Sequence, residues 1–194
     1  STMYTILVTG ANRGIGLGLV RELLALKKVT RIYATTRNIE KSTELSAIKD
    51  DRLRVLEVEI NNDESIKNAA KEIATESPTG IDLLINNAGV LNLYTVAGEI
   101  KRAKLNEQVE VNFTSQFILT QIMLPLLRRG ATSHGSAWVV NIGSAAGSLS
   151  LGHATEAHTL GAYAMSKAAL NMFSRVAAAE LDKDNIHVMT MHPG

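Results

Sequence analysis

The chain of 194 residues contains no cysteine. This absence excludes disulfide bonds, zinc sites built on thiolates and a cysteine nucleophile. An excess of charge is also missing, because 20 lysine and arginine residues are balanced by 19 aspartate and glutamate residues, for a net charge of +1. Such a balance creates no field that would gather nucleic acid or an anionic membrane. We therefore expect no nucleic-acid partner, and any anion must be bound by a local site.

Long apolar runs are absent as well. No stretch reaches the roughly 18 consecutive apolar residues that a membrane-spanning helix needs. The short apolar run at residues 4–8 leads directly into a glycine turn, which is unlike a signal peptide. We therefore expect a cytoplasmic protein without a membrane partner. The length fits one domain, since domains usually have about 100–200 residues.

Short apolar and β-branched runs alternate with longer stretches of helical spacing, a pattern typical of parallel strands joined by crossover helices. Six strands are predicted, at residues 4–9, 31–36, 53–60, 81–86, 137–142 and 186–192. Five helical stretches are predicted between them, from near residue 13, at 41–48, after Asp63 as N-cap, at 105–129 and at 162–181. The expected fold is therefore α/β, with one doubly wound parallel sheet in the order 3-2-1-4-5-6.

The first predicted strand leads into a glycine-rich turn that opens a helix. The turn reads Thr9-Gly10-Ala11-Asn12-Arg13-Gly14-Ile15-Gly16. Gly10 permits a tight exit from the strand, Gly14 lets the backbone approach a ligand, and Gly16 allows the helix to pack closely on the strand. Free N–H groups and a partial positive charge at the helix N-terminus can hold a pyrophosphate. Strand, glycine triad and amphipathic helix in this order indicate a Rossmann-type dinucleotide site.

The end of the second predicted strand bears on the choice of nucleotide. An NAD site usually has a carboxylate there for the ribose hydroxyls, whereas the 2′-phosphate of NADP needs cationic donors. This chain has Arg37 at that point, and the first acidic residue is Glu40. Arg37 and Arg13 of the glycine turn form a pair of phosphate donors. NADP is therefore the expected cofactor, ahead of NAD.

The glycine spacing, Gly-x3-Gly-x-Gly, resembles the nucleotide turn of short-chain dehydrogenases/reductases. The resemblance extends along the chain through Asn86-Asn87-Ala88-Gly89, Asn112, Ser144, Tyr163-x3-Lys167 and Pro193-Gly194. Within that family the chain is similar to the Sniffer carbonyl reductases and the C-factor group. The resemblance implies a single NAD(P)-binding domain over residues 1–194. It also implies hydride transfer between NADP(H) and a carbonyl or alcohol substrate.

Four polar residues form the predicted catalytic set. Hydride transfer to a carbonyl builds negative charge on oxygen, so a hydrogen-bond donor and a proton are needed. Tyr163 is the predicted acid/base, and Lys167, one helical turn later, places a positive charge beside the phenol that favours the phenolate. Ser144, at the carboxyl end of the fifth strand, donates to the substrate oxygen. Asn112 interrupts the fourth helix locally and, as the resemblance implies, holds a water that passes protons to Lys167.

The predicted cofactor contacts come from several segments. Where the family usually has an aspartate that caps the adenine amino group, this chain has Glu59, which is one methylene longer. The full predicted set is Gly10, Asn12, Arg13, Gly14, Ile15, Gly16, Arg37, Glu59, Ile60, Asn87, Ala88, Gly89, Tyr163, Lys167, Pro193 and Gly194. No metal site is predicted.

Two other functions compete with this interpretation. A serine hydrolase fails in detail, because the nucleophile elbow needs a glycine two residues before Ser144, where Ile142 stands. A non-catalytic NADP-binding regulatory or signalling protein stays open, because family members continue beyond Gly194 with a lid over the substrate and a further strand. We expect the chain to lack this strand and lid, which would leave the sixth strand as an exposed apolar edge.

The expected partners are a small carbonyl compound and a second copy of the chain. The lid and the loop at residues 147–161, which is rich in small residues and histidine, would shape the substrate pocket. The fourth and fifth helices have enough apolar surface to pair with another subunit. A homodimer is therefore predicted.

Overall fold

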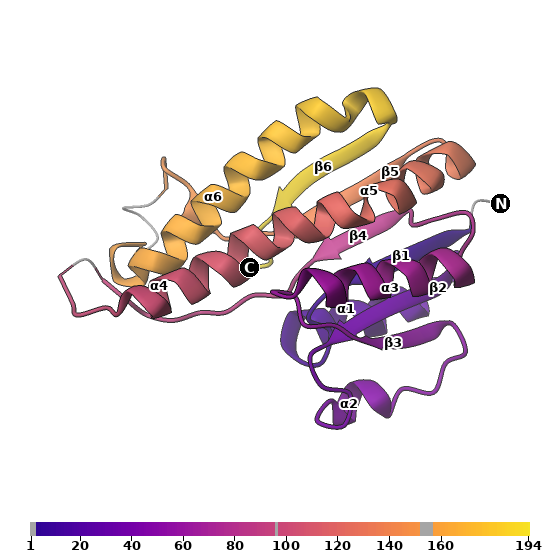
Figure 1. Ribbon diagram of the computed structural model, residues 1–194, viewed down its shortest axis with the longest axis horizontal. Coiled ribbons are helices and arrows are strands. Elements are labelled where there is room, and N and C mark those ends of the chain that lie inside the picture. The colour runs from indigo at the N-terminus through magenta and orange to yellow at the C-terminus, as the bar shows by residue number, and fades with distance from the viewer. Residues whose placement is uncertain (1–2, 96, 152–156) are drawn as a thin grey trace.

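Figure 1 shows the computed structural model, which describes residues 3–95, 97–151 and 157–194. The strands are β1 Tyr4–Val8, β2 Val29–Thr36, β3 Leu53–Glu57, β4 Leu83–Asn86, β5 Ala137–Ile142 and β6 Ile186–Met191. The α-helices are α1 Gly14–Ala25, α2 Thr43–Ser46, α3 Asp63–Glu76, α4 Arg102–Val109, α5 Ser115–His134 and α6 Ala157–Leu181. A π-helix, η1, spans Glu110–Thr114, and the short 3₁₀-helices are η2 Ala145–Gly147 and η3 Asp182–Asp184.

The six strands form one sheet in the order β3-β2-β1-β4-β5-β6. Every neighbouring pair is parallel. The predicted α/β class and strand order are therefore confirmed. A parallel sheet of this kind brings the carboxyl ends of its strands to one edge, where ligands bind.

Side chains of the strand β1 pack in the hydrophobic cores on both faces of the sheet. Leu7 packs in a core that includes residues of α3 and α5, whereas Ile6 and Val8 pack in a core that includes residues of α1. Side chains alternate between faces along a strand, so a strand covered on both sides needs an unbroken apolar run. Helices therefore cover both faces here, with α1 on one side and α3 and α5 on the other (Figure 1).

The strand β3 is shorter than predicted. It stops at Glu57, although the apolar pattern suggested a strand to residue 60. The N–H of Glu59 donates to the Ser65 hydroxyl at 3.0 Å rather than to a neighbouring strand, because the chain is already turning toward α3. The other strand ends differ from the predictions by at most two residues.

The N-cap of α3 is Asn62, and the prediction of Asp63 is wrong. The Asn62 side chain accepts the N–H of Ser65 at 3.1 Å. Asp63 is instead the first helical residue, where a carboxylate is favoured by the positive end of the helix dipole. The helix ends at Glu76, two residues before Pro78, as the proline predicted.

The fourth predicted helix is longer than expected and is not one α-helix. It begins at Arg102 and ends at His134, whereas the prediction covered residues 105–129. The π-helix η1 divides it into α4 and α5 and contains Asn112. The predicted local interruption at Asn112 is thus confirmed.

The helix α6 begins at Ala157 rather than at residue 162, with a kink at Gly161. The predicted loop at 147–161 is therefore shorter, and its residues 152–156 lie outside the described residues. The strand β6 is the last strand in the order of the sheet, and Met189 and Met191 on it are exposed. Among the described residues no helix is long and apolar enough to cross a membrane.

Candidate active site and cofactor cavity

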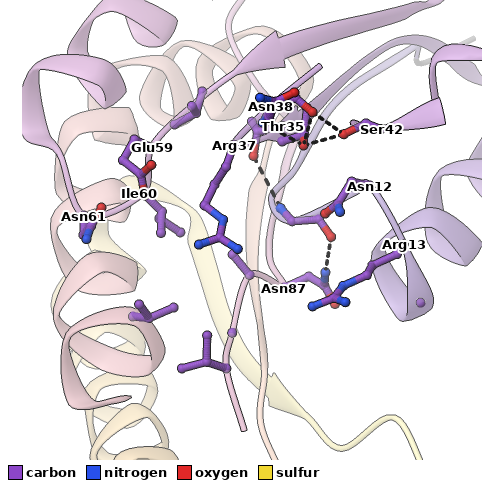
Figure 2. Close-up of a pocket in the computed structure, with 18 of the residues that line it drawn as sticks. Asn12, Arg13, Thr35, Arg37, Asn38, Ser42, Glu59, Ile60, Asn61 and Asn87 are labelled. Carbon is purple, nitrogen blue, oxygen red and sulfur yellow. Dashed lines mark hydrogen bonds between the residues drawn. The ribbon is translucent and has the colours of Figure 1, made fainter. Parts of the chain in front are cut away.

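A cavity of about 680 Å³ lies at the carboxyl ends of β1 to β4 (Figure 2). Its volume is in the range of small-molecule sites. Eleven of the predicted cofactor residues line it: Gly10, Asn12, Arg13, Gly14, Ile15, Arg37, Glu59, Ile60, Asn87, Ala88 and Gly89. Their contact with a nucleotide stays a prediction, but one cavity brings them together.

Asn87 fixes the glycine turn to the end of β4 (Figure 2). Its Nδ2 donates to Thr9 O and to Gly10 O, each at 3.0 Å. Gly10 has φ +63°, and a Cβ on it would lie 2.8 Å from Ala88 Cα. A Cβ on Gly16 would collide with Gly10 O, so this glycine serves the close packing of α1 rather than the cavity itself. Side-chain carbon is excluded at both positions.

The N-terminus of α1 opens directly at the cavity. Gly14 is the first helical residue, and the N-cap Arg13 makes no side-chain capping bond. A Cβ on Gly14 would meet no atom within 4 Å, so the space beside the backbone is open. The first N–H groups of a helix lack partners within the helix. They are available here for an anionic group in the cavity.

Cations gather where the turn after β2 meets the glycine turn. Figure 2 shows Arg37 extending from the end of β2 and Arg13 from the start of α1, both at the cavity. Within the part of the chain that the structure describes, neither guanidinium has an ion-pair partner. Lys41 lines the same cavity and adds a third cation that sequence reasoning missed. This donor set suits a phosphate.

The turn after β2 is held in shape by its own polar groups. The Thr36 and Ser42 hydroxyls are 2.7 Å apart, and Ser42 Oγ donates to Asn38 O at 2.6 Å. Asn38 Oδ1 accepts the N–H of Lys41 at 2.8 Å. These bonds fix the backbone from which Arg37 extends without using its guanidinium. Asn38 and Ser42 also line the cavity and were missed by sequence reasoning.

Lys167 lies buried at the carboxyl end of β5. Its Nζ donates to Ile142 O at 2.7 Å and lies 5.7 Å from the centre of the Tyr163 ring. The residue is 5% exposed, and burial lowers the pKa of Lys167 to about 8. The four-residue spacing therefore places the cation beside the aromatic ring on one face of α6, as predicted.

Ser144 is the N-cap of the short helix η2 and lies two residues beyond the end of β5. Its Oγ accepts the N–H of Ala146 at 3.2 Å. This bond uses a lone pair of the oxygen and leaves the hydroxyl proton for donation. Asn171 of α6 donates to Gly147 O at 3.1 Å and so ties η2 to the helix that carries Lys167. Ser144 and the ammonium of Lys167 both lie at the end of β5, and the Tyr163 ring lies beside that ammonium.

Asn112 is fully buried in η1. Its Oδ1 accepts the Val90 N–H at 2.8 Å, and its Nδ2 donates to Val90 O at 2.9 Å and to Ser166 Oγ at 3.0 Å. The Ser166 hydroxyl donates in turn to Tyr163 O at 2.7 Å. Asn112 therefore joins the loop after β4 to α6. The water relay to Lys167 stays a prediction.

Gly89 is the point where the cavity meets the catalytic groups. A Cβ on Gly89 would lie 3.3 Å from Asn112 Oδ1 and 3.8 Å from Lys167 Nζ. Asn112 and Lys167 therefore lie next to the cavity, although neither they nor Ser144 and Tyr163 are among its lining residues. Pro193 and Gly194, at the end of β6, are exposed and are not among the lining residues of the described structure. Their predicted cofactor contact is not supported by the cavity.

A chain of buried polar side chains lies in the same half of the sheet. Asn86 Nδ2 donates to Thr120 Oγ1 at 3.0 Å and to Asn141 Oδ1 at 2.7 Å. Asn141 Nδ2 donates to Ser174 Oγ at 2.8 Å. All four residues are at most 4% exposed. The chain connects α5, β4, β5 and α6 through side chains alone.

Comparison with known proteins identifies the family. A model of the short chain dehydrogenase family matches residues 4–194. The chain belongs to this family. This short-chain dehydrogenase is 34% identical over 197 residues to a rhamnolipid-biosynthesis 3-oxoacyl-acyl-carrier-protein reductase of Pseudomonas aeruginosa, covering 97% of the chain and 71% of that protein. It spans about half, 47%, of the mouse estradiol 17-beta-dehydrogenase 2, to which it is 33% identical.

The fold of the chain is also similar to solved structures of carbonyl reductases. The short-chain dehydrogenase superimposes with a TM-score of 0.95 on a Caenorhabditis elegans protein assigned as the carbonyl reductase Sniffer, with 42% identity over 100% of this chain and 86% of that one. An NADPH-bound carbonyl reductase from chicken fatty liver gives a TM-score of 0.93 and 33% identity, covering 100% of this chain and 76% of that one. The predicted resemblance to the family and to Sniffer is confirmed.

Proposed function

We propose that this protein is an NADP(H)-dependent carbonyl reductase in which Tyr163 exchanges the proton. The observation that carries the proposal is the position of Lys167. Its buried Nζ contacts Ile142 O, two residues before Ser144, and lies beside the Tyr163 ring. A proton donor, a cation and a hydroxyl at the carboxyl end of a parallel sheet are what carbonyl reduction needs. The carbonyl reductases to which the chain is similar support the same reaction class.

The residues of the cavity fit a dinucleotide with an extra phosphate. The N-terminus of α1 would hold the pyrophosphate, and Arg13, Arg37 and Lys41 would hold the 2′-phosphate. Glu59 and Ile60 would line the adenine, with Asn87, Ala88 and Gly89 toward the second ribose. Bound NADPH supplies the hydride. The chicken reductase is described as NADPH bound, which supports NADP ahead of NAD.

The protein's own groups handle the charge and the proton. Ser144 donates a hydrogen bond to the carbonyl oxygen, where negative charge builds during reduction. Tyr163 delivers the proton to that oxygen. Lys167 stabilises the phenolate that remains, because an opposite charge nearby favours the ionised form. In the oxidation direction the phenolate of Tyr163 takes the proton of the alcohol.

The first test measures NADPH oxidation against aldehydes, ketones and diketones, with NADPH binding followed by fluorescence on the same sample. We expect wild-type turnover, whereas Tyr163→Phe should keep NADPH binding and lose about 10²- to 10⁴-fold in kcat, the usual worth of acid–base catalysis. The matched control Tyr4→Phe, at the start of β1, should keep full activity. Binding without turnover in the wild type would favour a non-catalytic NADP-binding protein. A wild-type rate in Tyr163→Phe would refute its role.

We also propose a homodimer formed through α5 and α6. Phe117 of α5 is 43% exposed, and Met172 and Val176 of α6 are 60% and 52% exposed. The Phe117 ring packs on an aromatic ring of α6 with centroids 4.9 Å apart, so the two helices form one surface. Arg175 and Glu180 line a shallow hollow on α6.

A further inference from the structure

The loop at residues 89–94 connects the cofactor cavity to α6. It starts at Gly89 and Val90, which line the cavity. It ends where Tyr94 O accepts the N–H of Ala162, at 3.3 Å, one residue before Tyr163. Gly161 makes this approach possible, because a Cβ there would collide with Tyr94 O. The end of this loop therefore lies against the backbone of α6 one residue before Tyr163.

Two side-chain amides from successive turns hold the loop between its ends. Asn112 bonds both the N–H and the carbonyl of Val90. Four residues earlier, Gln108 of α4 accepts the N–H of Asn92 at 2.8 Å through Oε1. The first contact holds the part of the loop that lines the cavity. The second holds the part that leaves the cavity and continues toward α6.

Gln108 is fully buried, and its Nε2 has no hydrogen-bond partner in the described structure. The orientation of the amide is determined by its contact, because a backbone N–H can only donate and must face the oxygen. The amino group is then left inside the protein without a partner. A buried donor without a partner is unfavourable, and a leucine of similar size would avoid it. The hydrogen bond from the Asn92 N–H to Gln108 Oε1 is the interaction that offsets this cost.

The neighbours of Gln108 on the helix place this contact next to the cavity. Glu107 and Val111 line the cavity, whereas Gln108 faces inward. We propose that Gln108 is a positioning residue. It sets the path of residues 92–94 and thereby the placement of the carbonyl substrate at Tyr163, without contributing to dinucleotide binding. This inference rests on the proposed reductase function.

The test compares Gln108→Leu and Gln108→Glu with the control Gln121→Leu, which makes the same change at an exposed glutamine of α5. For Gln108→Leu we expect an NADPH Kd within about twofold of wild type and a kcat/KM for the carbonyl substrate lower by about 10- to 100-fold, because a displacement of about 1 Å near the reacting atoms has effects of that size. Gln108→Glu keeps the acceptor oxygen and should recover most of the lost kcat/KM. The control should match the wild type in both measurements.

The same bond can be broken from its other end. Asn92→Pro removes the N–H without changing α4, and it should reproduce the loss of kcat/KM with unchanged NADPH binding. This variant serves if Gln108→Leu fails to fold. An NADPH affinity that falls in step with turnover would overturn the proposal, as would a folded Gln108→Glu variant no better than Gln108→Leu. Wild-type protein without turnover would refute the reductase assignment itself, whereas equal turnover in wild type and Gln108→Leu would refute only the role of Gln108.

Discussion

The ammonium group of Lys167 lies in surroundings that disfavour its charge. The residue is almost fully buried, and burial alone lowers its pKa from 10.5 to about 8. Close to neutral pH the group is therefore near the point at which it gives up its proton. Groups with such shifted pKa values are typical of sites where protons move. The same shift has a consequence for stability.

The free energy of unfolding should rise with pH between about 8 and 10.5. In this window the unfolded lysine keeps its proton while the folded one has lost it, so the unfolded state binds more protons and stability increases with pH. The total gain is about 3 kcal/mol, at about 1.4 kcal/mol per pKa unit. Lys167→Met should lack this rise. The measurement is urea unfolding of the wild type and of Lys167→Met between about pH 8 and 10.5. If the free energy of unfolding rises equally with pH in both proteins, the shifted pKa does not belong to Lys167.

The sequence predicted the positions of residues that are spaced along one helix. It did not predict the positions of residues that depend on how a turn folds. Tyr163 and Lys167 are four apart on one helix, which is enough to place them together. Lys41 enters the cavity only because the turn after β2 folds back on itself. Asn62 rather than Asp63 caps α3 for a similar reason, since both are good caps and the path of the chain decides between them.

At the scale of elements, the proposed function assigns the choice between NADP and NAD to the turn after β2, which carries Arg37 into the cavity. Because Thr36, Asn38 and Ser42 hold it by bonds that do not involve Arg37, a change at Arg37 should alter the cavity's charge without unfolding the turn. Arg37→Asp should lower the preference for NADP over NAD by about 10- to 100-fold, because a hydrogen bond to a charged group is worth about 1.5–3 kcal/mol. The ratio of kcat/KM for the two cofactors is the measurement.

A charge change elsewhere provides the control for this prediction. Lys27→Asp alters the net charge equally, but it lies in the turn before β2, at the opposite end of the strand from the cavity. It should leave the cofactor ratio unchanged. If Arg37→Asp also leaves the ratio unchanged, the 2′-phosphate is held elsewhere. If the ratio changes equally in both variants, the change reflects the net charge of the protein and not a contact of Arg37 with the cofactor.

The helix from residue 102 to residue 134 shows the limit of prediction for an element. Apolar spacing indicated a helix, and Asn112 marked the point of interruption. The π-helical form of that interruption depends on bonds from Asn112 to Val90 and Ser166, which are distant in sequence. Local sequence carries no signal for such partners. Gln108 was missed for the same reason, because its partner lies in an irregular loop.

For the whole molecule, the sheet order was predictable because right-handed crossovers leave few alternatives once six strands alternate with helices.

The proposed dimer surface on α5 and α6 can be tested by substitution. Met172→Glu combined with Val176→Glu should turn a dimer into a monomer, because two carboxylates would be buried at the apolar contact. Sedimentation velocity at micromolar concentration is the measurement. Met3→Glu, at an exposed apolar residue before β1, is the control and should stay dimeric. A monomeric wild type would refute the proposed interface.

The buried polar chain through Thr120, Asn86, Asn141 and Ser174 also affects how the molecule opens. If α5 leaves the sheet, Asn86 loses its bond to Thr120, and if α6 leaves, Asn141 loses its bond to Ser174. Each loss costs about 1–3 kcal/mol. The bond between Asn86 and Asn141 couples the two contacts, because each amide must keep its orientation for both helices to stay bonded. We expect native-state hydrogen exchange to report β4, β5, α5 and α6 as one cooperative unit, with a common opening free energy rather than a separate one for each helix.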